Sequence, residues 1–305
     1  MGKIAVALEQ ALARRHMRGE AGRTAPRTIA RGDGWAVADV LCTSGPQDRA
    51  FEERHEHYAI AMVLAGSFQY RSPLGAALMT SGSLMLGNPG QPYECGHEHA
   101  EGDRCVVFWY EPDYFEGVAG AGFRVPRLPP VRPLAPLVAS AGAGVLSAAD
   151  TPWEDLAVRL AIETAGLAAR QSPAQRVVPR NAEARVTRAV REIDRRPDAD
   201  LSLRRLAQGS GLSPYHFLRT FERLTGVTPH QYILRARLRD AAARLATASR
   251  KIINVALDSG FGDVSNFNRA FRAEFGLSPR AYRASVVPDR GAATSQGSPR
   301  SLSES

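Results

Sequence analysis

Two cysteines and two histidines stand close together in the first half of the chain. Cys95, His97 and His99 alternate with other residues in ECGHEH, and Cys105 follows six residues after His99. Thiolate and imidazole groups are ligands suited to Zn²⁺ or another borderline-soft divalent metal. Alternation by two places the first three on one side of an extended segment. The pattern predicts a metal site or a thiol that senses oxidation, with loop histidines beside structural cysteines as the ordinary alternative.

A second histidine pair and a third cysteine lie upstream of this cluster. His55 and His57 stand one residue apart in ERHEH, where they either complete the site or flank the start of a strand. With Cys42 the chain has three cysteines. Because this number is odd and small, we expect free thiols or metal ligands rather than a disulfide framework.

The residues around these clusters follow the pattern of many short strands. From 29 to 125, apolar runs such as WAVADVLC and DRCVVFWYEP alternate with Gly, Pro, Asn and Ser, which predicts a sandwich or barrel. Residues 1–28 are expected to be a tail or a short helix of uncertain order. A low-complexity stretch at 287–305 is expected to be a disordered tail.

Between the strands and the C-terminal third, residues 126–178 predict a proline-rich connector followed by helices. Leu156, Leu160 and Leu167 lie on or near one face of the second helical segment. This leucine face is either part of a core or the seam of a dimer.

Basic charge is concentrated in the C-terminal third. The whole chain has a net charge of +8, whereas residues 180–290 contain 21 Lys and Arg against 11 Asp and Glu, a net charge of +10. This asymmetry indicates a nucleic-acid-binding module beside a domain of different use. No window approaches the roughly 18 consecutive apolar residues of a membrane span, so we expect a cytoplasmic protein without membrane contact.

The same basic region contains an internal repeat with an offset of 49 to 50 residues, which favours a tandem duplication. The first copy contains, in order, Leu206, Ala207, Gly211, Phe217, Arg219, Phe221, Gly226, Pro229 and Tyr232. The second copy contains Val255, Ala256, Gly260, Phe267, Arg269, Phe271, Gly276, Pro279 and Tyr282. Each copy predicts two short helices joined by a tight turn, a helix-turn-helix unit.

The second helix of each unit has a buried face and an exposed face. Helical spacing predicts the buried residues to be Phe217, Phe221 and Leu224 in the first unit and Phe267, Ala270, Phe271 and Phe275 in the second. The exposed faces carry Tyr215, Leu218, Arg219 and Arg223, and Ser265, Asn266, Arg269 and Arg272. In the DNA major groove, Arg can bind guanine and Asn adenine through paired hydrogen bonds, and Leu can pack on a thymine methyl. The pattern predicts that these exposed faces, with their Arg and Asn side chains, enter the major groove of double-stranded DNA.

Residues 180–286 resemble the DNA-binding domain of the AraC/XylS family of bacterial transcription regulators. The resemblance rests on LAQGSGLSPYHFLRTFERLTG in the first unit, and on ALDSGF, FNRAFRAEFGLSP and the following Tyr282 in the second. It implies two helix-turn-helix subdomains joined by a long helix, which places both recognition helices in successive major grooves on one face of DNA. By position, it also implies that the base-facing residues are Tyr215, Leu218 and Arg219 in the first unit and Ser265, Asn266 and Arg269 in the second. It also implies a homodimer, and contact with RNA polymerase if the protein is an activator.

Residues 29–125 more loosely resemble the small cupin-like β-barrel that commonly precedes this DNA-binding domain. Cupin enzymes hold a metal with His-x-His, a nearby Glu and a later His. Here His55 and His57 fit, but YAIAMVLAG contains no carboxylate, and Tyr93 stands where the later histidine is expected. We therefore expect a two-domain α+β regulator that is not an enzyme, with an unknown effector and with zinc or another divalent metal as candidate cofactor. The alternatives are a metal-dependent cupin enzyme with a DNA-binding domain and a DNA binder without an effector.

Overall fold

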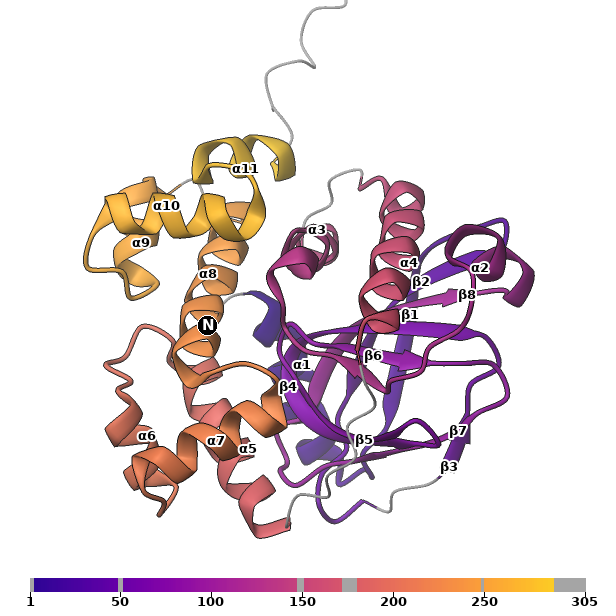
Figure 1. Cartoon of the computed structure of the whole chain (residues 1–305), viewed down its shortest axis with the longest axis horizontal. Helices are drawn as coiled ribbons and strands as arrows, with labels where there is room; N and C mark the ends of the chain where they lie inside the picture. The colour runs from indigo at the N-terminus through magenta and orange to yellow at the C-terminus, as the bar shows by residue number, and fades with distance from the viewer. Residues whose placement is uncertain (1–2, 49–51, 147–150, 172–179, 248–249, 288–305) are drawn as a thin grey trace, which may run out of the picture.

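The computed structural model describes residues 3–48, 52–146, 151–171, 180–247 and 250–287 (Figure 1). A β-sheet region with flanking helices comes first along the chain, and a helical region follows it. The two lie side by side, with the strands on the right of Figure 1 and the later helices on the left. The tail predicted at 287–305 lies outside the described residues, apart from Val287.

The sheet region is built from antiparallel strands that share one long strand. The described strands are β1 (Thr24–Gly32), β2 (Trp35–Cys42), β3 (Glu52–Arg54), β4 (Tyr58–Ser72), β5 (Gly75–Thr80), β6 (Leu84–Gly87), β7 (Pro92–Gly96), β8 (Asp103–Tyr110) and β9 (Arg127–Leu128). A first layer has the order β1-β2-β8-β4-β6-β9. The second half of β4 pairs instead with β5 and β7, and β7 pairs with β3, which makes a second layer. Because the first layer ends in the edge strands β1 and β9, the predicted closed barrel is not confirmed.

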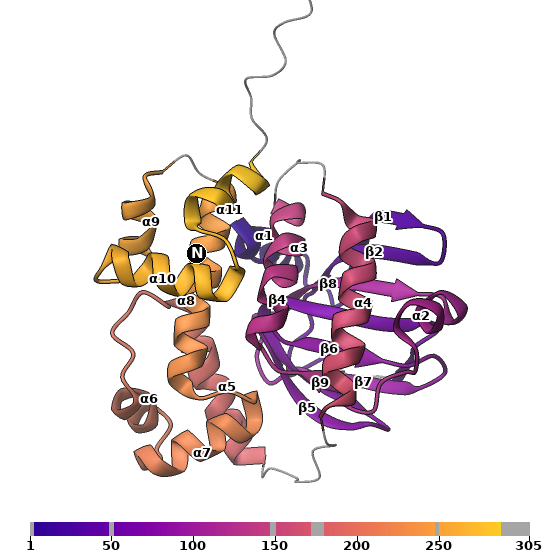
Figure 2. The ribbon, with the colours of Figure 1, turned by 45° about the horizontal axis from the view of Figure 1, so that its top comes forward.

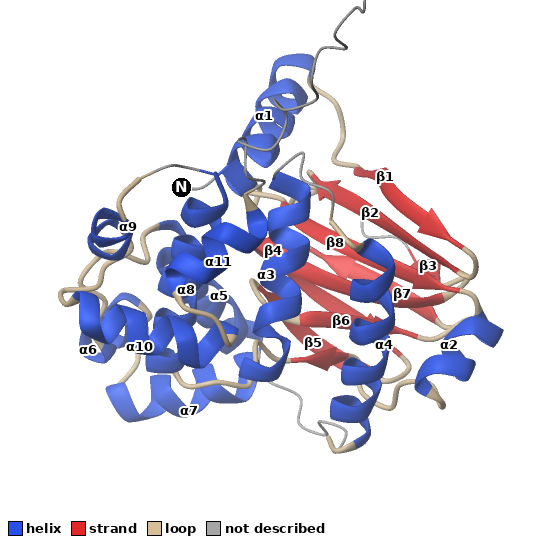
Figure 3. Cartoon of the chain, turned by 90° about the horizontal axis from the view of Figure 1, so that it is seen from above, coloured by secondary structure: helices blue, strands red, loops and turns tan. Residues whose placement is uncertain are grey.

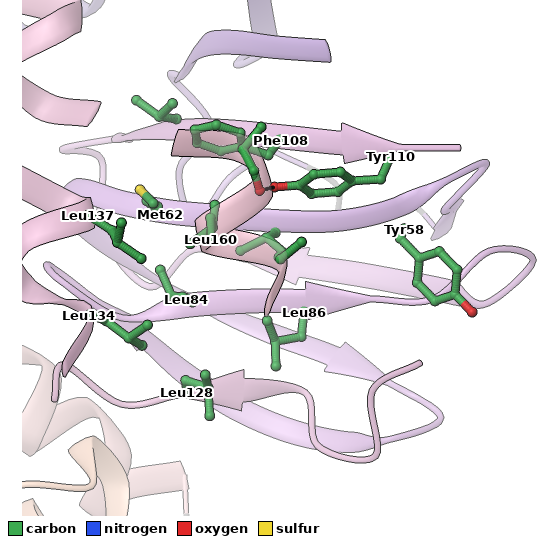
Figure 4. Close-up of a cluster of buried hydrophobic side chains, with 14 of the residues drawn as sticks. Tyr58, Met62, Leu84, Leu86, Phe108, Tyr110, Leu128, Leu134, Leu137 and Leu160 are labelled. Atoms are coloured by element: carbon green, nitrogen blue, oxygen red, sulfur yellow. Dashed lines mark hydrogen bonds between the residues drawn. The ribbon is translucent and has the colours of Figure 1, made fainter. Parts of the chain in front are cut away.

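The first layer is buried on both faces, so its strands feed two apolar cores. Side chains alternate along each strand. One face carries Val37, Ile60, Met62, Leu84, Leu86, Val106 and Phe108 into a core under helices (Figure 4), and the other carries Ala38, Val40, Ala61, Val63, Cys105 and Val107 toward the second layer. Two-sided burial explains why the part of β4 in this layer, YAIAMVLAG, is a nearly continuous apolar run without polar alternation.

Helices cover the outer face of the first layer (Figure 3). They are α2 (Pro112–Ala119), the short η1 (Arg132–Leu134), α3 (Ala135–Leu146) and α4 (Trp153–Ala169). Leu156 and Leu160 on α4 are 4% and 0% exposed within the core that they share with the strands. The Tyr110 hydroxyl on β8 donates to the Ala157 carbonyl at 2.9 Å (Figure 4).

The leucine face of α4 therefore belongs to the core of its own chain. The sequence predicts dimerisation helices within 126–178, but Leu156 and Leu160 are already covered by β-strand side chains. Leu167 packs against the same core. Period-3.6 spacing identifies an apolar helix face and does not say which surface buries it.

The N-terminal segment contains the helix that was one of the two expected forms. Residues 3–18 form α1 (Lys3–Arg18), and β1 begins at Thr24, so 1–28 is not simply a tail. The Arg15 guanidinium donates to both carboxylate oxygens of Asp48, at 2.9 and 2.7 Å, and Leu8 is buried. Because these partners are distant in sequence, local patterns indicate the helix but not the contacts that hold it in place.

The helical region has shorter helices gathered at the two ends of one long helix (Figure 2). Its helices are α5 (Arg180–Arg195), α6 (Leu203–Gly209), α7 (Pro214–Thr225), α8 (Pro229–Thr247), α9 (Ile252–Asp258), α10 (Val264–Phe275) and α11 (Pro279–Val286). The first core joins α5, α6 and α7 to the first half of α8, and the second joins α9, α10 and α11 to its second half. We call these unit 1 and unit 2. Both units also contact the sheet region.

Candidate functional site

Helix α7 of unit 1 is fixed at both ends by local interactions. The Ser213 hydroxyl accepts a hydrogen bond from the His216 N–H at 3.3 Å, and Pro214 occupies the first helical position. At the other end Gly226 has φ of 79°, a left-handed conformation that costs glycine little. Side-chain capping satisfies N–H groups that the first helical turn leaves unpaired. The sequence therefore defines where α7 begins and ends.

Helix α10 of unit 2 repeats this arrangement with a different capping residue. The Asp263 carboxylate accepts from the N–H groups of Ser265 and Asn266 at 3.0 and 2.9 Å. These backbone hydrogen bonds lower the pKa of Asp263 below its ordinary value. Gly276 ends the helix with φ of 76°.

The aromatic cores of the two units have matching geometry. In unit 1 the Phe217 and Phe221 ring centroids are 5.5 Å apart, and Tyr232 meets Phe221 edge-on at 5.6 Å. In unit 2 the corresponding separations, Phe267 to Phe271 and Phe271 to Tyr282, are both 5.5 Å. Edge-to-face contact at this distance is favourable for aromatic pairs. The repeat seen in the sequence is thus a repeat of packing.

The opposite faces of α7 and α10 are open. Seven of the residues predicted to contact DNA are exposed, namely Tyr215, Arg219, Arg223, Ser265, Asn266, Arg269 and Arg272. Leu218 is half-buried. Helices α7 and α10 lie toward opposite ends of α8 (Figure 1).

On each open face an arginine is held by a residue one helical turn earlier. The Arg219 guanidinium donates to the Tyr215 hydroxyl at 3.1 Å and lies over its ring, 5.9 Å from the centroid. The Arg269 guanidinium donates to the Asn266 side-chain oxygen at 3.1 Å. Holding a long side chain in place reduces the rotamer entropy that it loses on binding.

The Cys/His cluster lies where β7 and β8 meet the end of β2. Cys95 is on β7, His97 directly follows β7, and Cys105 is on β8. The His97 Nε2 atom lies 2.8 Å from Asp103 Oδ2 and 3.6 Å from Cys42 Sγ. Among the described residues, Cys42, His97 and Asp103 form the group whose ligand atoms lie within 4.8 Å of one another.

This group differs from the predicted set of Cys95, His97, His99 and Cys105. His99 turns away because its Nε2 atom meets the Ser67 hydroxyl at 3.0 Å and its Nδ1 atom accepts from the Glu101 N–H. The chain turns at residues 98–101, so the alternation that continues along a strand ends at His97. Cys105 stays at the margin, with its Sγ atom 3.7 Å from Asp103 Oδ1.

His55 and His57 do not complete the site. The buried His55 meets the Tyr70 hydroxyl at 2.9 Å and stacks on Tyr93, with ring centroids 4.1 Å apart. His57 instead lies 3.6 Å from the Glu111 carboxylate. The arrangement gives the two histidines separate structural partners.

Local spacing did not place Cys42 or Asp103 in this group. Asp103 stands two residues before Cys105 in GDRC, so alternation on β8 places both on one face. Cys42 comes from β2, where it pairs in register with Asp103. That pairing joins residues far apart in sequence, so the local spacing of residues does not predict it.

The surroundings of the cluster favour the charged form of the histidine and the neutral form of two of the thiols. Burial alone would lower the pKa of His97, but its hydrogen bonds to Asp103 and Cys42 and their negative charge raise it to about 10. Burial raises the pKa of the Cys95 and Cys105 thiols well above the ordinary range. Because the thiolate is the oxidisable form, these two cysteines are in surroundings that disfavour oxidation.

Comparison with known proteins places the helical region. A helix-turn-helix domain family matches residues 206–285. The chain is 38% identical over 85 residues to the transcriptional activator AarP of Providencia stuartii, covering 28% of this chain and 63% of AarP. It is 37% identical over 91 residues to the regulatory protein SoxS of Salmonella typhimurium, covering 30% of this chain and 85% of SoxS. An AraC-type DNA-binding domain structure from Chromobacterium violaceum is 28% identical, covering 35% of this chain and 96% of that one, with a TM-score of 0.34.

The sequence matches and the duplicated unit define a DNA-binding transcription regulator. The chain belongs to the AraC/XylS family. The similarity to AarP and SoxS extends over less than a third of this chain. Within the described residues, no helix has the length and apolar character needed to cross a lipid bilayer.

Proposed function

We propose that this regulator reads DNA through the open faces of α7 and α10 while its sheet region, a cupin-like sensing domain, receives a signal. The proposal is supported above all by the duplicated presentation of one arginine per unit, each held by a partner one turn earlier. An arginine so placed suits paired hydrogen bonds to guanine in the major groove.

The net charge supports the same surface as the DNA interface. Residues 180–290 carry +10, against +8 for the whole chain. A basic module attracts the phosphate backbone whatever its sequence, and base contacts from the recognition helices then supply specificity. Homodimerisation and contact with RNA polymerase, which the family resemblance implies, stay predictions.

The enzyme alternative finds less support. A cupin enzyme needs His55 and His57 on one metal, whereas these side chains have separate partners, Tyr70 and Glu111. The matched relatives are transcription regulators. We therefore propose that the protein is not an enzyme and that its sheet region binds a ligand without transforming it.

Arginine substitutions test the DNA interface. The full chain first selects a binding site from a randomised DNA pool, and affinity is then measured at one fixed salt concentration. Arg219→Ala and Arg269→Ala should each weaken specific binding by about 1–3 kcal/mol and relax the preference at one base position. Arg159→Ala, an exposed arginine on α4, is the matched control and should bind as the parent does. Unchanged affinity in both recognition-helix variants would refute the assignment.

A further inference from the structure

The space between the two sheet layers is lined by side chains that bind soft metals. A cavity of about 260 Å³ is bordered by the thiols of Cys42, Cys95 and Cys105, with His97 and Asp103 beside them. Mg²⁺ and Ca²⁺ prefer sites made of oxygen ligands. Sulfur, nitrogen and oxygen donors gathered at one cavity suit a borderline-soft transition metal.

The separations among three of these groups are close to those of a tetrahedral site. Zinc–sulfur bonds of about 2.3 Å and zinc–nitrogen bonds of about 2.0 Å place the two ligand atoms roughly 3.6 Å apart. Cys42 Sγ and His97 Nε2 are already 3.6 Å apart. The His97 Nε2 to Asp103 Oδ2 separation of 2.8 Å would have to open by about half an ångström to reach the nitrogen–oxygen edge of such a site.

We propose that Cys42, His97 and Asp103 bind a borderline-soft divalent transition-metal ion such as Zn²⁺. The ion binds the thiolate and the neutral imidazole, so the thiol proton and the proton that His97 Nε2 shares with Asp103 are released to solvent. Three protein ligands leave a fourth position that water or a small ligand can take, as in open zinc sites, and all three ligand residues line the cavity. The Cys105 thiol lies 3.7 Å from Asp103 Oδ1, the carboxylate oxygen that does not face His97, and helps to position the Asp103 side chain.

Two of the ligands are fixed by the sheet and one is not. Cys42 and Asp103 are paired in register across β2 and β8, so their side chains share a face and move little. His97 lies just after the end of β7, at the start of the turn that leads to β8. Metal binding therefore acts mainly on the segment from 97 to 103.

That segment touches the DNA-binding region, and the regulatory part of this inference rests on the proposed function. Glu101 lies between His97 and Asp103 and accepts a hydrogen bond from Arg191 Nε on α5 at 3.0 Å. It also forms ion pairs with Arg191 and Arg195. Opening the His97–Asp103 pair would shift Glu101 and change how unit 1 is held. The metal thereby becomes the signal, and by linkage DNA must alter metal affinity in return.

Cobalt provides the probe for the site. Full-length protein stripped with a chelator is titrated with Co²⁺, whose bond to a thiolate gives near-ultraviolet charge-transfer absorption. We expect about one equivalent to bind with this band and to be displaced by Zn²⁺. Cys42→Ser and His97→Gln should each lose affinity by ~100-fold or more, because each removes a ligand. Cys95→Ser and His99→Gln are the matched controls and should bind within about threefold of the parent.

The control variants also define the result that would contradict the proposed ligands. Loss of binding in Cys95→Ser and His99→Gln, with Cys42→Ser unaffected, would overturn the assignment, as would binding without a thiolate band. If Cys42→Ser does not fold, the rate at which a thiol reagent alkylates Cys42 in the parent protein, with and without Zn²⁺, tests the site instead. Zn²⁺ should then protect Cys42, and no protection would overturn the site.

Coupling is tested separately on the DNA site selected from the random pool. DNA affinity should differ between metal-free and Zn²⁺-loaded parent, and Glu101→Gln should bind Zn²⁺ normally while losing that difference. Glu94→Gln is the matched control, because this carboxylate on β7 pairs with Arg71 and should leave coupling intact. Zn²⁺ binding with equal DNA affinity in both states would overturn the regulatory role alone. Failure to bind DNA in either state would overturn the proposed function, and the cobalt titration would still decide the metal site.

Discussion

Units 1 and 2 have the same interior but are attached to the sheet region in different ways. Unit 1 docks on strands and turns, where the Ser81 hydroxyl donates to Asp194 at 2.8 Å and Arg127 donates to the Leu224 carbonyl at 2.6 Å. Leu78 of β5 enters its core. Unit 1 is therefore in direct contact with the layers that enclose the cavity.

Unit 2 docks on the connector helix α3. Ala135 and Ala139 pack against its core, and the Tyr282 hydroxyl donates to the Ala139 carbonyl at 3.4 Å. The buried Glu274 pairs with Arg235 at 3.1 Å and with Arg132 at 3.7 Å. Among the described residues, a change in the sheet layers can reach unit 2 through η1, α3 and α8. The duplication thus preserved how each unit folds and left each free to acquire its own docking contacts.

The largest expected effects test whether the two interiors are equivalent. Phe221→Ala and Phe271→Ala should each cost about 3–5 kcal/mol of unfolding free energy, because both rings are fully buried against a tyrosine. Denaturant unfolding of the full chain measures the loss. Tyr215→Ala, at a side chain 68% exposed, is the control and should unfold like the parent. A large loss in one unit only would show that the interiors are not equivalent.

Helix α4 offers a comparison between a buried and an exposed residue. Leu160→Ala should cost about 2–5 kcal/mol, because its side chain is fully buried under the strands. Ile162→Ala, on a side chain 49% exposed, should change stability by at most about 0.5 kcal/mol. Sedimentation should give both variants the oligomeric state of the parent. If the Leu160 variant stays folded and the dimer dissociates, the leucine face of α4 would be a dimer interface rather than part of the core.

The two regions differ in how far their sequences predict them. The helical region could be predicted because its signals are local: Ser213 and Gly226 delimit α7, and Phe217 and Phe221 recur one turn apart. In the sheet region the deciding contacts are non-local. Spacing identifies His97 and Cys105, but Cys42 joins them only through the β2–β8 pairing, which a single sequence does not reveal.

The stability of the sheet region should be more sensitive to acid than that of the helical region. Burial lowers the pKa of His55 to about 4, whereas in the unfolded chain a histidine ionises near pH 6.5. The contribution of His55 to the free energy of unfolding is full above pH 6.5. It decreases as pH falls from 6.5 toward 4, by about 3 kcal/mol in total, because the unfolded histidine binds a proton and the buried one does not. The helical region contains only the exposed His216 and His230 and has no such buried group among its described residues.

Tryptophan fluorescence during urea unfolding measures this effect, because all three tryptophans, Trp35, Trp109 and Trp153, lie in the sheet region and its helices. His99 also has a lowered pKa from burial, so the parent loses stability from more than one group. The difference between the parent and His55→Gln isolates His55. Equal acid sensitivity in the two proteins would contradict its role.

The smallest effects concern the residues that hold the two recognition arginines. Tyr215→Phe removes the hydroxyl that accepts from Arg219, and Asn266→Ala removes the oxygen that accepts from Arg269. Loss of one hydrogen bond should weaken DNA binding by about 0.5–1.5 kcal/mol. Asn266→Ala should have the larger effect, because asparagine can itself bind adenine, whereas the Tyr215→Phe variant keeps an aromatic ring beneath the guanidinium. Binding to selected DNA at one salt concentration tests this order, and a larger loss in Tyr215→Phe would show that the hydroxyl itself contacts DNA.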